Sequence, residues 1–150
     1  MTVKLDDKDA KILELLGVHA EYTTRQIAKK VNLPITTVHN RIGKLRNSGV
    51  IKKYTVELDY SALEKNFVAY ILVSADLELL KARHKSQYDL VADIKKFYFV
   101  ERVDIVAGGT DVVVMMRVKD VAEFDSCLLG KLQLVEGIDK TQSLIVIHGR

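Results

Sequence analysis

Eight basic side chains and no acidic one lie between Tyr22 and Val56, although the whole chain of 150 residues carries 23 Lys and Arg against 20 Asp and Glu. The eight are Arg25, Lys29, Lys30, Arg41, Lys44, Arg46, Lys52 and Lys53. Side chains of one charge repel each other, so a cluster of this kind usually faces a polyanion. The chemistry that this segment offers is therefore the binding of phosphate groups.

A row of short polar side chains lies inside the same basic segment. At helical spacing, residues 35–48 form an apolar stripe of Ile35, Val38, Ile42 and Leu45. The opposite side carries Thr36, Thr37, His39, Asn40, Gly43, Lys44 and Asn47. Such groups suit the base edges of a major groove, where Asn40 can pair with adenine, while Arg41 and Arg46 at the flanks face phosphates. Every solvated helix has a polar outer face, so this prediction depends on the whole row.

Three short helices are predicted to position these side chains. They cover Asp6–Gly17, Thr24–Val31 and Ile35–Ser48. Asp6 and Asp9 are spaced as a cap for the first helix, and Gly49 ends the third because glycine tolerates a left-handed backbone. Residues 50–58 then alternate like a strand and lead into a linker. Two short helices joined by a tight turn in a basic segment predict a helix-turn-helix that grips DNA.

The second half of the chain predicts a different module, in which strands and helices follow the order β-α-β-β-α-β. Strands are expected at Phe67–Ala75, Phe99–Ala107, Val112–Val118 and Ile138–Ile147, and helices at Leu77–Lys96 and after Asp120. This order is the split repeat of ferredoxin-like folds, a four-stranded antiparallel sheet with two helices on one face. Tyr70, Leu72, Val114 and Met116 are predicted to make the other face apolar, which marks an interface.

Together the two modules resemble the Lrp/AsnC transcriptional regulators, also called feast/famine proteins, over essentially the whole chain. Three runs carry the resemblance. They are Leu5-Asp6-x-x-Asp9-x-x-Ile12-Leu13, Ile27-Ala28-Lys29-Lys30-Val31 and Val38-x-x-Arg41-Ile42-x-x-Leu45-x-x-x-Gly49-Val50-Ile51-Lys52-Lys53-Tyr54. The chain departs from the family at Pro34, where family members commonly have a serine that would cap the recognition helix.

The resemblance implies an α+β protein that regulates transcription by sequence-specific binding of double-stranded DNA. Residues 1–51 would form a winged-helix-like helix-turn-helix domain, residues 52–64 a strand and hinge linker, and residues 65–150 a ferredoxin-like effector-binding and oligomerisation domain. Family members bind an amino-acid effector and pack sheet on sheet in homodimers that often assemble to octamers. The expected DNA contacts are Arg25, Thr36, Thr37, His39, Asn40, Arg41, Lys44, Arg46, Lys52 and Lys53.

The loop of residues 107–111, Ala-Gly-Gly-Thr-Asp, is the candidate effector site. In the family this place typically reads Thr-Gly-x-aromatic-Asp, and its backbone amides hold the effector's carboxylate; Ala107 and Thr110 depart from that pattern. Glycines let N–H groups converge on an anion, and Asp111 offers a partner for an ammonium group. The predicted contributors are Asp104, Gly108, Gly109, Thr110, Asp111, Thr141 and Ser143. The residues alone favour a plain hairpin turn, because Gly-Gly is a common two-residue connection, and only the resemblance favours ligand binding.

Neither catalysis nor a bound metal or cofactor is predicted. The four histidines are far apart, no phosphate-binding loop or nucleophile elbow is present, and Cys127 lies among apolar residues, as a buried thiol would. The single cysteine fits a reducing compartment. No apolar run approaches the ~20 residues of a membrane span, so we expect a cytoplasmic protein without a membrane partner.

Three other functions compete with an amino-acid-responsive regulator. An effector-independent, chromosome-organising DNA-binding protein would use residues 107–111 only as a turn. A metabolic enzyme with a ferredoxin-like regulatory domain would need a catalytic constellation, which the sequence does not offer. The basic helices would also suit structured RNA.

Overall fold

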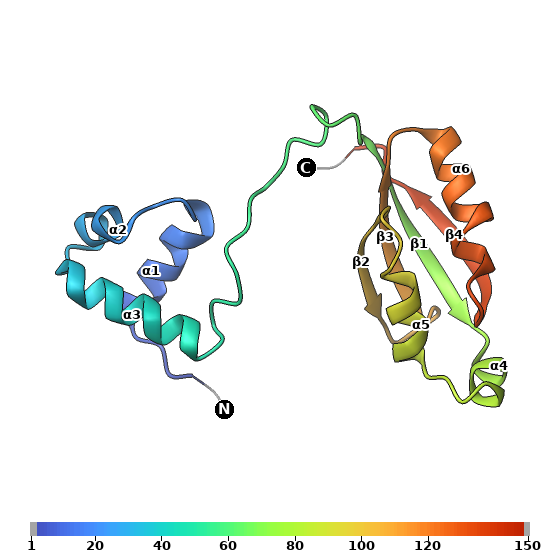
Figure 1. Ribbon diagram of the computed structural model, residues 1–150, viewed down its shortest axis with the longest axis horizontal. Helices are drawn as coiled ribbons and strands as arrows, with labels where there is room; N and C mark the ends of the chain where they lie inside the picture. The colour runs from blue at the N-terminus through green and yellow to red at the C-terminus, as the bar shows by residue number, and fades with distance from the viewer. Residues whose placement is uncertain (1–2, 149–150) are drawn as a thin grey trace. The chain divides into compact units, whose positions relative to one another are not determined.

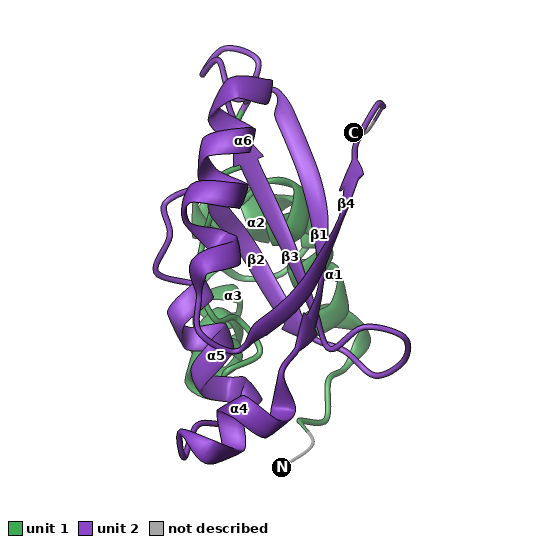
Figure 2. Cartoon of the chain, turned by 90° about the vertical axis from the view of Figure 1, so that its right-hand side faces the viewer, with its two compact units in different colours: residues 1–58 green, residues 59–150 purple. Residues whose placement is uncertain are grey.

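The computed structural model describes residues 3–148 and divides the chain into two compact units, residues 1–58 and 59–150 (Figure 2). Each unit has its own hydrophobic core. The described part of the first unit is helical, and the second is a four-stranded antiparallel sheet with helices. This combination confirms the predicted α+β class, a helix-turn-helix domain followed by a ferredoxin-like domain. The boundaries at residues 51 and 64 remain predictions.

The first unit contains α1 (Asp7–Val18), α2 (Thr24–Val31) and α3 (Ile35–Asn47), shown in Figure 1. The predicted cap of α1 is confirmed: the Asp6 carboxylate accepts hydrogen bonds from the amides of Lys8 and Asp9, and the Asp9 carboxylate accepts one from the amide of Asp6. Thr23 and Gln26 form a similar capping box on α2. The buried core side chains are Ile12, Ile27, Ala28, Val38 and Leu45.

A tight turn joins α2 to α3 and sets where α3 begins. Asn32 ends α2 with a left-handed backbone at φ 52°, a conformation that asparagine tolerates better than most residues. Pro34 occupies the N-cap position of α3 and supplies no side-chain hydrogen bond, because proline has no side-chain acceptor. The prediction that Ile35 joins the apolar stripe is wrong: its side chain is 47% exposed, because α3 packs through Val38, Ile42 and Leu45.

The segment after α3 differs from its predicted form. Gly49 has φ +76°, which confirms the expected left-handed stop. Residues 52–58 run without regular secondary structure, and Tyr54, Val56 and Leu58 are exposed. The strand predicted here is therefore absent, because no other segment of the described chain lies beside it as a hydrogen-bonding partner.

The second unit contains β1 (Phe67–Ala75), β2 (Val100–Ile105), β3 (Val112–Val118) and β4 (Ile138–Ile145) in the spatial order β2-β3-β1-β4. All three neighbouring pairs are antiparallel. Helices α4 (Leu77–Ala82), α5 (Gln87–Ile94) and α6 (Val121–Gly130) follow β1 and β3 along the chain. Figure 2 shows α5 and α6 on one face of the sheet.

The other face, which we call the open face, carries a different set of side chains from the predicted one. Val114 and Met116 are fully buried in the core under the helices, so their assignment to the open face is wrong. Strand pairing places Tyr70 opposite Met115 and Leu72 opposite Val113, and paired residues point to the same side. The two faces of β3 were exchanged in the prediction. Residues 112–116 are all apolar, so no polar side chain shows which residues face solvent.

The region between β1 and β2 was predicted as one helix and is two. Arg83 ends α4, His84 adopts a left-handed φ of 55°, and Ser86 begins α5 with a capping box to Asp89. A 3-10 turn, Leu132–Leu134, follows α6 before the chain enters β4. Gly137 stands at that entry with φ +102°, where a Cβ atom would lie 2.5 Å from Cδ2 of Leu80.

Candidate nucleic-acid interface and ligand pocket

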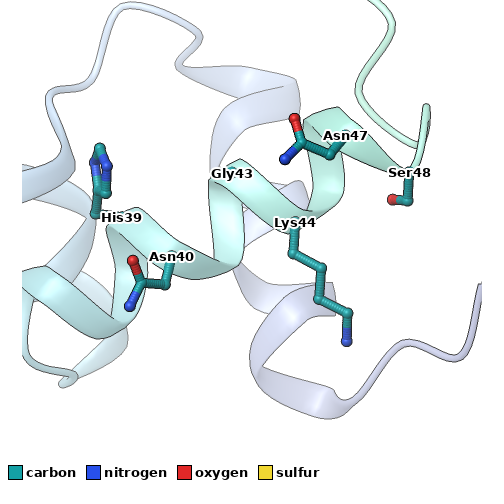
Figure 3. A pocket seen from close by; sticks show the side chains of 6 residues that line it. All are labelled: His39, Asn40, Gly43, Lys44, Asn47 and Ser48. Carbon is teal, nitrogen blue, oxygen red and sulfur yellow. The ribbon is translucent and has the colours of Figure 1, made fainter.

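The outer face of α3 forms a shallow depression of about 650 Å³ lined by His39, Asn40, Gly43, Lys44, Asn47 and Ser48. Figure 3 shows the side chains of His39, Asn40, Lys44 and Asn47 projecting from one side of this helix. Periodicity predicted this face, and the structure brings His39, Asn40 and Lys44 together on it. Thr36 is exposed one turn earlier and Thr37 is half-buried.

The basic side chains around this face are free of acidic partners, with one exception. Arg25, Lys44, Arg46, Lys52 and Lys53 are exposed, and none forms an ion pair within residues 3–148. Unpaired cations on a surface keep their full charge available for a polyanion. This electrostatic arrangement suits phosphate contacts on both sides of a groove-reading helix.

Arg41 is the exception and has a role that the sequence analysis did not foresee. Its Nη1 donates to Oδ1 of Asp9 at 2.7 Å and to Oδ2 of Asp6 at 2.8 Å. The hydrogen bond to Asp9, and then the one to Asp6, raises the pKa of Arg41. Arg41 therefore links α3 to the capping box of α1, and its predicted phosphate contact remains a prediction.

Gly43 lies at the centre of the exposed face of α3. A Cβ atom built at this position would meet no protein atom within 4 Å. Packing within the first unit therefore does not require a glycine here, although glycine costs a helix interior about 1 kcal/mol relative to alanine. Close approach of another molecule to this face would account for it.

In the second unit, the loop of residues 107–111 borders a pocket of about 560 Å³. Its lining residues are Leu72, Ser74, Gly109, Thr110, Lys140, Thr141 and Gln142. Gly108 has φ +142°, and the amides of Gly108, Gly109 and Thr110 donate to no protein acceptor in the described part of the chain. The Thr110 hydroxyl donates to the carbonyl of Val73 at 2.9 Å, which anchors the loop to β1.

Asp111 does not line this pocket, and its carboxylate is already engaged. Oδ2 accepts the Ala75 amide at 2.9 Å, and Oδ1 accepts Nε2 of Gln87 at 3.3 Å. The Asp111 amide also donates to the carbonyl of Val73. These bonds hold the end of the loop against β1 and α5, so the observed role of Asp111 is to position the loop.

Three other predicted contributors lie apart from the pocket or face away from it. Asp104 is on the edge strand β2, where its Oδ2 pairs with Nε of Arg102 at 2.6 Å. Thr141 and Ser143 pair with Val73 and Ile71, whose side chains point under the helices. The Thr141 hydroxyl accepts Nε2 of Gln133 there, so only Gly109, Thr110 and part of Thr141 border the pocket.

The residues that sequence reasoning missed are Leu72, Ser74, Lys140 and Gln142. Register pairs Leu72 with Gln142 and Ser74 with Lys140, so all four share the open face beside the loop. Their alternation along β1 and β4 was visible in the sequence. The missing signal was the pairing of β1 with β4, which is a long-range contact.

Cys127 lies in the core of the second unit. Cys127 is 1% exposed, which confirms the predicted buried thiol, and its Sγ lies 3.5 Å from the hydroxyl of Tyr98. Contacts with Cys127 and then Glu123 raise the pKa of Tyr98.

Among residues 3–148, no three His, Cys, Asp or Glu side chains are grouped as metal ligands would be. In the same residues, no helix has the length and apolar character needed to cross a membrane.

Comparison with known proteins identifies both halves of the chain. Residues 5–52 match the family described as winged helix-turn-helix DNA-binding, and residues 69–149 match the Lrp/AsnC ligand binding domain. The chain belongs to the Lrp/AsnC family. It is thus a DNA-binding transcriptional regulator of the Lrp/AsnC type with a ligand-binding domain.

Individual relatives agree with this Lrp/AsnC assignment. The HTH-type transcriptional regulator FL11 of Pyrococcus furiosus is 33% identical over 143 residues, which cover 95% of this chain and 89% of the relative. A regulator of Neisseria meningitidis, solved in complex with L-methionine, has a TM-score of 0.88 at 25% identity and covers 97% of this chain and 91% of its own. AsnC of E. coli shares the fold, with a TM-score of 0.85 at 19% identity over 98% and 95% of the two chains. The first two of these proteins are named as transcriptional regulators.

Proposed function

We propose that this Lrp/AsnC protein is a sequence-specific regulator whose assembly and DNA binding respond to a small amino-acid effector. The exposed face of α3 carries the proposal. His39, Asn40 and Lys44 surround one depression whose lining contains no acidic side chain. A polar, cationic helix face of this kind fits the major groove of DNA.

The roles of the DNA-contacting residues follow from their chemistry. Thr36, Thr37, His39, Asn40 and Lys44 discriminate between bases, because their side chains are short or carry hydrogen-bonding ends on the exposed face of α3. Arg25, Arg46, Lys52 and Lys53 provide phosphate contacts, and with them most of the affinity. Arg41 contributes to phosphate binding from its position beside Asp6.

A homodimer presents two such helices to successive major grooves, about 34 Å apart on a roughly palindromic site. The open face of the sheet supports this part of the proposal. Tyr70 and Leu144 are 40% and 46% exposed there, and they are paired on neighbouring strands. Packing two open faces together around this pair buries these side chains, while the pocket lies further along β1, beside Leu72 and Ser74. Further assembly of dimers, up to an octamer, follows the resemblance to the family.

The effector binds at the pocket beside the loop of residues 107–111. The unpaired amides of Gly109 and Thr110 are suited to an anionic group such as a carboxylate. The L-methionine complex of the Neisseria regulator supports an amino acid as the ligand class. Regulation requires that the ligand bind one assembly more tightly than another, since equal affinity shifts no population.

Competition binding with specific DNA, non-specific DNA and structured RNA, repeated at several salt concentrations, tests the DNA half of this function. Asn40→Ala should relax base preference, whereas Lys52→Ala should mainly weaken all duplexes and reduce the salt slope by about 0.9 per lost phosphate contact. Equal effects of both changes on all sequences would contradict the groove assignment. Preference for structured RNA over every DNA duplex would contradict DNA as the partner.

Calorimetric titration of the protein with the twenty amino acids tests the effector half. We expect heat from at least one amino acid, and a change in DNA affinity in its presence. If none of the twenty binds, the alternative function is favoured, namely an effector-independent, chromosome-organising protein for which residues 107–111 are only a turn. The proposed place of action is the cytoplasm, because the single cysteine fits a reducing compartment.

A further inference from the structure

We propose that the pocket beside the loop of residues 107–111 prefers a small molecule with two carboxylates, of which L-aspartate and L-glutamate are the amino-acid cases. This inference rests on the proposed function, in which that pocket holds the effector. It adds the chemical class of the ligand and identifies Lys140 as the residue that selects it.

The lining of the pocket contains one cation and no anion. Lys140 is exposed on β4, forms no ion pair within residues 3–148, and shares the open face with Ser74. The nearby carboxylates are engaged elsewhere: Asp111 accepts the Ala75 amide, and Asp104 pairs with Arg102. Among the lining residues, the available side-chain charge is therefore positive only.

The hydrogen-bonding groups of the pocket include donors from the loop and donors from β4. The amides of Gly109 and Thr110 form the loop set, and the Lys140 ammonium group with the Gln142 amide forms the β4 set. A carboxylate on each set satisfies both, since hydrogen bonds to ionised acceptors are about twice as strong as neutral ones. A neutral amino acid offers only one carboxylate and makes no charge-assisted hydrogen bond with Lys140, so it gains less on binding than a dicarboxylate does.

Polar residues outnumber large apolar side chains in the pocket lining, although the exposed surface of the lining is mostly apolar. Leu72 is the one large apolar side chain among the seven lining residues. Pockets that hold small apolar ligands are lined mainly by hydrophobic and aromatic side chains. Polar groups of the lining can therefore orient a ligand, while Leu72 and the aliphatic parts of its neighbours supply the apolar contact.

Titration calorimetry of the full chain with L-glutamate, L-aspartate, 2-oxoglutarate, L-methionine and L-lysine tests this inference. We expect at least one dicarboxylate to bind about tenfold or more tightly than L-methionine, because hydrogen bonds to charged groups are worth that factor or more. Tight binding of 2-oxoglutarate as well as L-glutamate would show that the two carboxylates are recognised without the amino group. Tight binding of the amino acids alone would show that the amino group is read too. Either result supports the proposal.

Lys140→Gln keeps a hydrogen-bonding side chain and removes the charge, so it should abolish the preference for dicarboxylates over L-methionine. Lys81→Gln makes the same change on α4, at an exposed lysine outside the pocket, and should leave the preference intact. A preference that survives Lys140→Gln overturns the proposal, as does an L-methionine affinity equal to or above that of every dicarboxylate. In that last case the sensor function stands. If none of the five molecules binds, this inference is overturned, while the titration with all twenty amino acids decides the sensor function separately.

Discussion

Arg41 on α3 holds the almost fully buried carboxylate of Asp9 on α1, with 2.7 Å between Nη1 and Oδ1. The Asp9 side chain is 4% exposed, and Asp9 is the one buried charged residue recorded among residues 3–148. A buried carboxylate without a partner is strongly destabilising, so the recognition helix and the first helix depend on each other through this contact. The orientation of the proposed DNA-reading face therefore depends on Arg41, a residue that is itself proposed to contact phosphate.

The hydrogen bonds that Asp6 accepts from the Asp9 amide and from Arg41 predict the pKa shift of the Asp6 carboxyl. The Asp9 amide, and then Arg41, lowers the pKa of Asp6 below its ordinary value of 3.8. Ionised Asp6 therefore stabilises the folded unit fully above that pH, and the contribution is lost as pH falls through the lower, folded pKa. NMR titration of the side-chain carboxyl should give a midpoint below 3.8 in the native protein.

Arg41→Gln should move this midpoint upward without restoring the ordinary value, because the larger contribution, the Asp9 amide, remains. The variant should also unfold at a lower temperature, since Asp9 loses its charged partner. Lys44→Gln removes a cation from the same helix that makes no ion pair, and should change neither quantity. An unchanged Asp6 midpoint in Arg41→Gln would show that the ion pair does not persist in solution.

Gly43→Ala should separate stability from DNA binding. Alanine gains about 1 kcal/mol over glycine in a helix interior, and the new methyl group meets no protein atom within 4 Å. We expect a more stable first unit in chemical denaturation and an affinity for specific DNA lowered about tenfold, because the methyl group stands between α3 and the bases. Gly17→Ala makes the same change on α1 and should stabilise without weakening DNA binding. Undiminished affinity in Gly43→Ala would place this face away from the groove.

Tyr70→Glu should disrupt the proposed dimer. A carboxylate in the middle of the open face would be buried without a partner when two sheets pack together. Sedimentation analysis should show a shift to monomers at concentrations where the native protein is dimeric or larger. Tyr88→Glu, at a residue 79% exposed on α5, is the matched control and should keep the native assembly. Dimers that persist in Tyr70→Glu would exclude the open face as the interface.

Gly137→Ala should destabilise the second unit by roughly 2–4 kcal/mol, because a left-handed backbone and an overfilled core are each costly for alanine. The added Cβ would lie 2.5 Å from Cδ2 of Leu80, which is itself buried. Urea unfolding measures the loss. Gly130→Ala, at the end of α6 with no atom within 4 Å of the new Cβ, should change the free energy of unfolding by less than about 1 kcal/mol. Equal stabilities of the two variants would show that β4 shifts to make room.

Local sequence signals predicted the elements that have clear ends. Strands β1 and β3 and helix α2 begin and end where expected, because polar residues, glycines or caps border them. The helix expected over Leu77–Lys96 is interrupted, although apolar residues recur at helical spacing throughout this segment. The left-handed backbone of His84 ends the first part, and the Ser86 cap begins the second. The buried face of β3 was misassigned because both faces of this strand carry apolar residues. The sequence therefore shows no alternation of apolar and polar residues that would identify the buried face.

The candidate sites show a similar division. The outer face of α3 was predictable because helical periodicity fixes it within a few residues. The link from Arg41 to Asp9 was not, since the two residues are 32 positions apart. Lys140 was missed for the same reason: only the pairing of β4 with β1 brings it beside a loop some thirty residues earlier in the chain.

The engagement of Asp111 affects how substitutions at the ligand loop should be understood. Its two oxygens are bonded to Ala75 and Gln87, so removing the carboxylate frees the loop to sample many shapes before a ligand arrives. Binding must then include the entropic cost of ordering that loop, which lowers affinity without the loss of any ligand contact. A weakened effector response in an Asp111 variant would report lost preorganisation, not a missing recognition group.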